Sequence, residues 1–100
     1  MWQQTFKSVS AVFATIVINT SVEVMAHSIS FYNLGNTTVK MDGFAPIVPN
    51  GFFIIDDYGD PRIFHDENLV ISFDATGVSN PTNLLKIYTQ KIKGFPYNNC

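Results

Sequence analysis

Hydrophobic residues along this chain recur with a period of two, in short runs that end at turns. Ile29 and Phe31 alternate with serines, and Leu69, Ile71 and Phe73 alternate with a valine and a serine. Such alternation is typical of β-strands that bury one face. Together with β-branched and aromatic runs elsewhere, the pattern predicts strands over about residues 6–18, 22–34, 37–41, 44–48, 52–56, 62–65, 69–73 and 84–92.

The turns between these runs are regularly spaced. Gly35, Gly43, Gly51 and Gly59 follow one another at intervals of eight residues, and glycine supplies the positive φ that tight corners need. No long stretch has the apolar spacing of an amphipathic helix. We therefore expect an all-β chain, an antiparallel β-sandwich or jelly-roll-like fold of roughly eight short strands. One domain over residues 1–93 and an irregular tail over residues 94–100 complete the prediction.

Two strands have special positions in this scheme. Pro46 makes the segment 44–48 an edge, because proline cannot donate to a strand ladder. The first strand, 6–18, is apolar on both faces, so it is either central in a sandwich or covered by a neighbouring subunit. Its candidate assembly interface consists of Val9, Val12, Phe13, Ile16 and Ile18.

Charge is scarce and unevenly placed. Only 14% of the residues are charged against 46% hydrophobic, and a typical charged share is about 25%. Between Met1 and Val39 only Lys7 and Glu23 carry a charge. We expect this stretch to need a partner surface, which predicts a homo-oligomer. The net charge of −2 argues against nucleic-acid binding.

The segment 1–26 also admits a second interpretation, as a secretory signal with Lys7 in its charged region. Its apolar core has no leucine, is rich in β-branched residues and is interrupted at Asn19, so a strand suits it better. The apolar run is too short for a membrane span. Cys100 is the only cysteine, which excludes a disulfide within the chain.

Candidate chemistry is limited. Asp56, Asp57 and Asp60 could bind a cation such as calcium, although their spacing also suits an acidic turn in which aspartate caps its own backbone. His65 is followed by two acidic residues, but neighbours on a strand point to opposite faces and cannot converge. We expect no catalytic residues, cofactor or metal, and hence no enzyme.

The tyrosines are the better candidates for exposed contact. Tyr58, Tyr88 and Tyr97 combine an apolar ring with a polar hydroxyl, which suits a binding surface. In the last strand, Tyr88 is predicted on a solvent-exposed face with Lys86, opposite the buried Leu85 and Ile87.

The segment from Ser28 to Phe73 contains four motifs in order. A strand ends in an Asn/Gly turn, a short apolar-Asp-Gly corner follows, then a proline-glycine turn, then a late strand. They read SISFYNLGNTTV (28–39), MDGF (41–44), IVPNGF (47–52) and LVISF (69–73). In these motifs the chain resembles small β-sandwich virion proteins of bacteriophages, of the spike, penton or minor capsid type.

The resemblance implies a structural role in the virion, with assembly among copies of the chain and with other virion proteins, and it carries over no catalytic residue. The alternative is a secreted carbohydrate- or protein-binding β-sandwich module, released by cleavage after Ala26. A cupin-like enzyme would need several histidines converging inside a barrel, and the chain has only His27 and His65.

Overall fold

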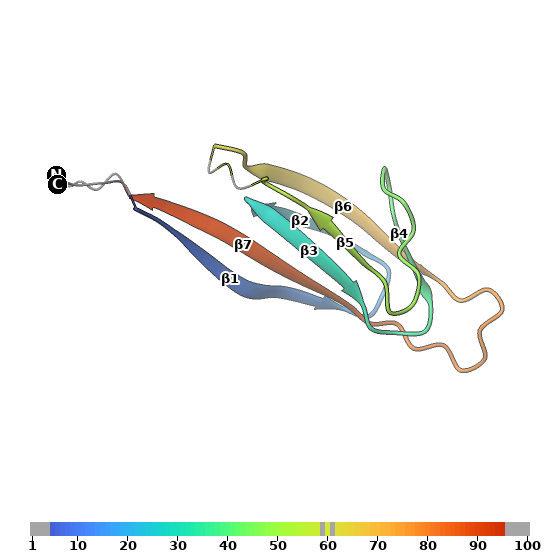
Figure 1. The fold of residues 1–100 in the computed structure, drawn as a ribbon. Coiled ribbons are helices and arrows are strands. Elements are labelled where there is room, and N and C mark those ends of the chain that lie inside the picture. Colours follow the sequence, from blue (N-terminus) through green and yellow to red (C-terminus); the bar gives the residue numbers. More distant parts are fainter. Residues whose placement is uncertain (1–4, 59, 61, 96–100) are drawn as a thin grey trace, which may run out of the picture.

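The computed structural model describes residues 5–58, 60 and 62–95. Over these residues the chain forms seven strands and no helix, so none of its described segments is a helix that could cross a membrane. Figure 1 shows the strands. They are β1 (Thr5–Ile16), β2 (Thr20–Ala26), β3 (Ser28–Asn33), β4 (Thr38–Met41), β5 (Phe52–Ile55), β6 (His65–Asp74) and β7 (Leu85–Phe95).

The strands form two antiparallel sheets. One sheet has four strands in the order β1-β7-β3-β5, and the other has three in the order β2-β6-β4. An isolated antiparallel bridge pairs Val39 of β4 with Ile47. The all-β prediction is confirmed, and the two sheets are compatible with a sandwich.

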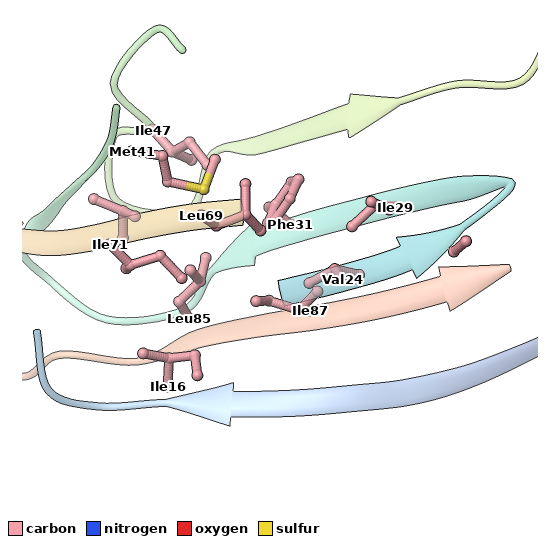
Figure 2. Close-up of a cluster of buried hydrophobic side chains, with 12 residues drawn as sticks. Ile16, Val24, Ile29, Phe31, Met41, Ile47, Leu69, Ile71, Leu85 and Ile87 are labelled. Carbon is pink, nitrogen blue, oxygen red and sulfur yellow. The ribbon is translucent and has the colours of Figure 1, made fainter. Parts of the chain in front are cut away.

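The hydrophobic core lies between the two sheets, because each strand turns its alternate apolar residues inward. Figure 2 shows Phe31, Leu69 and Ile87, which come from both sheets, in one cluster. Phe31 also stacks on the half-buried Phe53, with ring centroids 6.1 Å apart. The buried members are Ile16, Val24, Ala26, Ile29, Phe31, Val39, Met41, Ile47, Leu69, Ile71, Leu85 and Ile87.

A buried polar side chain ties the two sheets together at one end. Asn33, the last residue of β3, is fully buried and donates from Nδ2 to the carbonyl oxygens of Thr37 (2.7 Å) and Ile47 (2.9 Å). Its Oδ1 accepts a hydrogen bond from the backbone N of Gly35. A Cβ on Gly35 would lie 2.2 Å from the carbonyl oxygen of Thr82, so only glycine fits there.

The predicted turns occur, but not always for the predicted reason. Gly43 has a φ of 85°, as expected for a residue that supplies a positive φ. At the next corner the positive φ belongs to Asn50 (64°), while Gly51 donates a backbone hydrogen bond to Val48. Asparagine tolerates this region better than most residues, so the corner did not need its glycine for φ.

Several predicted strand boundaries are wrong. The predicted strand 22–34 divides at His27 into β2 and β3, which lie in different sheets. The buried positions change parity at that point, from Val24 and Ala26 to Ile29 and Phe31, because the chain crosses from one inner face to the other.

The other differences concern strand ends. β6 runs without a break from His65 to Asp74, and Arg62 lies in a turn rather than in a strand. The predicted strand 44–48 is reduced to the single bridge at Ile47. β7 continues through Gly94 and Phe95, into the predicted irregular tail. The remaining tail residues, 96–100, lie outside the described part of the chain.

Candidate assembly surface

The outer face of the four-stranded sheet carries exposed apolar residues from all its strands, with Ser30 and Lys86 as polar residues among them. Pairing places Val12 of β1 beside Tyr88 of β7, Tyr88 beside Ser30 of β3, and Ser30 beside Ile54 of β5. In antiparallel sheets paired residues share a face. We call this surface the outer apolar face, and its members are Val12, Tyr32, Leu34, Phe52, Ile54 and Tyr88.

Aromatic rings form the centre of this face. Tyr32 stacks on Phe52 with ring centroids 6.1 Å apart and meets Tyr88 edge-on at 5.5 Å. An open cavity of about 350 Å³ is lined by Ser30, Tyr32, Leu34 and Tyr88. Three of these four residues carry a hydroxyl group and none carries a charge, so the cavity favours an apolar or weakly polar partner.

The strand period explains how these side chains come to the surface. In β5 the sequence reads Phe-Phe-Ile-Ile, and the register directs Phe53 and Ile55 inward while Phe52 and Ile54 point outward. Phe52 remains 65% exposed. An apolar run in a strand that has only one inner face must leave half its members on the outside.

The outer face of the three-stranded sheet is different. It carries the charged residues Glu23, Lys40 and Asp66, with exposed polar residues between them and Met25 and Val70 as its exposed apolar residues. A side-chain hydrogen bond with Asp66 raises the pKa of Glu23. This face has the composition of an ordinary solvated sheet surface.

The predicted interface residues of the first strand fall into three groups. Val12, Phe13 and Ile18 are exposed, as an interface requires. Ile16 is only 8% exposed and belongs to the core, because its partner in β7 is the buried Leu85, so its assignment to a surface was wrong. Val9 pairs with β7, but its side chain lies outside the described part of the structure.

The predicted tyrosine contacts do not form one group. Tyr58 is 84% exposed, in the turn after β5. Tyr88 is half-buried within the outer apolar face rather than on a fully solvated strand face. Tyr97 lies outside the described residues. The structure thus joins Tyr88 to Tyr32 and Phe52.

The acidic corner after β5 is organised by its own backbone. Asp56 Oδ1 accepts hydrogen bonds from the backbone N of Asp57 (2.8 Å) and of Tyr58 (3.2 Å). Asp60 accepts from the side chain and the backbone N of Arg62, and these bonds lower its pKa to about 2. Within residues 5–58, 60 and 62–95, no group of three or more potential ligands could hold a metal ion.

The histidine followed by acids lies at the start of β6. His65 Nε2 donates to the carbonyl oxygen of Asp56 at 2.9 Å. Because the three residues occupy one strand, Asp66 points to the opposite face from His65 and Glu67. The expectation that this triplet does not converge is confirmed.

The residues that sequence reasoning missed are Tyr32, Leu34, Phe52 and Ile54. The signal for two of them was present in the doubled apolar run 52–55, which cannot be buried on both sides in an edge strand. Tyr32 follows two serines on the same strand face, so the pattern indicated a polar surface there. Its contact with Phe52 depends on strand pairing.

Comparisons of the chain with models of protein families, with curated proteins and with solved structures gave no match.

Proposed function

We propose that this protein is a structural component of a virus particle, of the bacteriophage capsid, penton or spike type, and acts by assembling with copies of itself and with neighbouring shell proteins. It performs no catalysis and uses no cofactor. The observation that carries the assembly role is the outer apolar face, which spans all four strands of one sheet. Contiguous exposed apolar patches on a small domain mark interaction sites.

The pairing pattern of the strands supports the virion context. β1 pairs with β7, β2 with β6, β3 with β5, and β4 bridges to Ile47, all antiparallel. If the Ile47 segment is counted as a short strand, the first four strands pair in reverse order with the last four. That order belongs to the jelly roll, an architecture common in viral capsid proteins and also found in lectins and cupins.

The outer apolar face is tested by a matched pair of substitutions. Ile54 is 44% exposed on the outer apolar face, and Val70 is 47% exposed on the outer face of the other sheet. We expect the unmodified chain to be oligomeric at micromolar concentration by light scattering. Ile54→Lys should shift it toward monomer, because a charge in the core of an interface must be desolvated, whereas Val70→Lys should leave the oligomer intact.

A monomeric unmodified chain, or equal effects of the two substitutions, would contradict the assembly role. The virion context has its own test, which is mass spectrometry of purified particles from the source of the sequence. We expect this chain among the particle proteins at a fixed ratio to the main shell protein. Its absence from intact particles would overturn the virion part of the proposal.

A second candidate function, carbohydrate binding by a secreted module, is favoured by the cavity beside Tyr32 and Tyr88. Sugar rings stack on aromatic faces, and the hydroxyl groups that line the cavity could orient them. Saturation-transfer NMR with a panel of monosaccharides distinguishes this function. A signal that Tyr32→Ala abolishes and Tyr58→Ala retains would support it over assembly.

A further inference from the structure

We infer that β1 pairs antiparallel with β1 of a second copy of this chain, across a two-fold axis, and joins the two four-stranded sheets into one sheet of eight strands. The inference rests on the proposed assembly function and identifies the assembly partner as a second copy of the chain. It concerns the edge of the sheet, which is distinct from the outer apolar face.

The free edge of β1 presents a row of backbone N–H and C=O groups that another strand can pair. The Gln90 carbonyl oxygen accepts a hydrogen bond from His27 N at 3.0 Å, so the backbone of Gln90 points away from β1. Successive residues of a strand direct their backbone groups to opposite edges. Lys91 therefore points toward β1, and its partner Val9 points back toward β7. By the same alternation Ser10 and Val12 direct their N–H and C=O groups to the free edge.

The outer part of β1 also lacks support from the rest of the sheet. β3 pairs with β7 only as far as Gln90, so Thr5–Val9 and Lys91–Phe95 form a two-stranded ribbon, visible at the end of β1 and β7 in Figure 1. Two strands alone are marginally stable in water. Pairing through β1 would join this ribbon to the four-stranded sheet of the second copy, because Val12 of that copy pairs with Tyr88 within the full sheet.

The other sheet edges are better protected than β1. β5 has only four residues, β4 has four residues, carries the exposed Lys40 and is bridged by Ile47, and β2 has seven residues, five fewer than β1. Short strands, charged residues and covering segments are the usual ways to prevent strand addition. β1 is twelve residues long, with Lys7 as its single charge and no proline.

The sequence of the edge is complementary to itself. The register with β7 shifts between Val12 and Ala14, so the regular free edge ends at Val12. The residues whose backbone N–H and C=O groups point to this free edge are Phe6, Ser8, Ser10 and Val12. A two-fold axis at Val9 pairs Ser8 with Ser10 of the second copy and Phe6 with Val12 of the second copy. All four of these residues are then hydrogen-bonded across the edge, and Lys7 lies opposite Ala11.

An axis perpendicular to the sheet keeps corresponding faces on the same side. The outer apolar faces of the two copies would then form one continuous surface, because Val12 lies on that face near the shared edge. A closed, isologous dimer of this kind is the commonest symmetric assembly. A strand from a different protein would lack the matching symmetry and is an outcome of the test.

The first experiment removes hydrogen bonding at the edge without touching the pairing of β1 with β7. Ser10→Pro deletes an N–H group that points to the free edge. The matched control is Ser21→Pro, on the edge strand β2 of the other sheet. Asp42 N donates to the Val70 carbonyl, so by alternation Val70 faces β4 and its partner Ser21 faces the free edge of β2.

We expect Ser10→Pro to raise the dimer dissociation constant at least about tenfold, since the Ser8 carbonyl oxygen of each copy loses its donor. Ser21→Pro should leave it unchanged. Circular dichroism establishes that both variants are folded. Equal dissociation constants for folded Ser10→Pro and the unmodified chain would overturn the inference.

The second experiment tests the register by disulfide crosslinking of the full chain in a Cys100→Ser background. Val9 faces Val9 of the second copy as a non-hydrogen-bonded pair, at a Cα separation of about 4.5 Å, which a disulfide can span. Val9→Cys should give a crosslinked dimer on oxidation. Val12→Cys should not, because the two Val12 positions are six residues apart along the ladder, about 20 Å.

The outcomes separate the edge from the outer apolar face. Loss of the dimer in Ser10→Pro and a crosslink through Val9→Cys support the edge, even if Ile54→Lys has no effect and the proposed face fails. Absence of the crosslink, with Ile54→Lys dissociating the assembly, overturns the edge and leaves the face. An unmodified chain that is monomeric alone but binds a foreign strand through Ser10 also overturns the inference.

Discussion

The two sheets bury similar inner faces but present very different outer faces. Phe31 and Ile87 on one sheet, and Val24 and Leu69 on the other, are fully buried in the same core. Outside, one sheet carries charged residues, whereas the centre of the other carries stacked aromatic rings. Formation of the core requires only that the inner-facing residues be apolar. Burial in the monomer therefore does not explain why the outer apolar face is apolar as well. The proposed assembly would give this surface a role.

The comparison is sharpest between two phenylalanines of the four-stranded sheet. Phe31 is fully buried and Phe52 is 65% exposed. We expect Phe31→Ala to lower the free energy of unfolding by about 3–5 kcal/mol, and Phe52→Ala by about 1 kcal/mol or less, since it loses one aromatic contact. Urea unfolding under dilute conditions measures both. Similar losses for the two variants would mean that the outer apolar face belongs to the core.

The next prediction concerns the connection between the sheets. Asn33→Ala leaves the buried carbonyl oxygens of Thr37 and Ile47 without the Nδ2 donor. Each unsatisfied buried group costs about 1–3 kcal/mol, so we expect a loss of about 3 kcal/mol. The control is Asn68→Ala, an exposed asparagine on the outer face of the three-stranded sheet, which should change stability by less than about 0.5 kcal/mol. Equal urea midpoints would contradict the role of Asn33.

The smallest expected effect concerns the pH dependence of stability and a charged residue of the three-stranded sheet, Asp74. Asp74 accepts hydrogen bonds from the hydroxyl and backbone N of Thr76 and lies 3.0 Å from Lys40 Nζ, which together hold its pKa well below the usual range. Its folded pKa is below its unfolded pKa, so its contribution to stability is present at neutral pH and is lost as the pH falls below about 4.

We therefore expect the melting temperature of the unmodified chain to fall more steeply below pH 4 than that of Asp74→Asn. Glu23 is the control of opposite sign, because its pKa is raised beside Asp66. Glu23→Gln should increase the melting temperature slightly at pH 7 and lose this advantage in acid. Parallel pH profiles for the unmodified chain and Asp74→Asn would contradict the assignment.

The fold class was predictable from local patterns. Period-two alternation located the inner faces of β3, β6 and β7, because burying one side of a strand constrains every second residue. The division at His27 was harder to predict, since 22–34 is a nearly continuous strand-forming run. Only the change of parity between Val24 and Ile29 marks the crossing to the other sheet.

The candidate site was predictable only in part. Val12, Phe13 and Ile18 were predicted as interface residues because the first strand is apolar on both faces, and they are exposed, but Ile16 proved to be core. Tyr32 and Phe52 were missed, because their contact joins residues twenty positions apart through strand pairing.

The sequence by itself determined an all-β chain, the inner faces of β3, β6 and β7, and too little charge near its beginning, because side-chain period and composition are local properties. The tertiary structure decided which strands are edges and which apolar residues share an outer face. Those properties depend on pairing between distant segments, such as β1 with β7 and β3 with β5, and no local pattern specifies the partner of a strand.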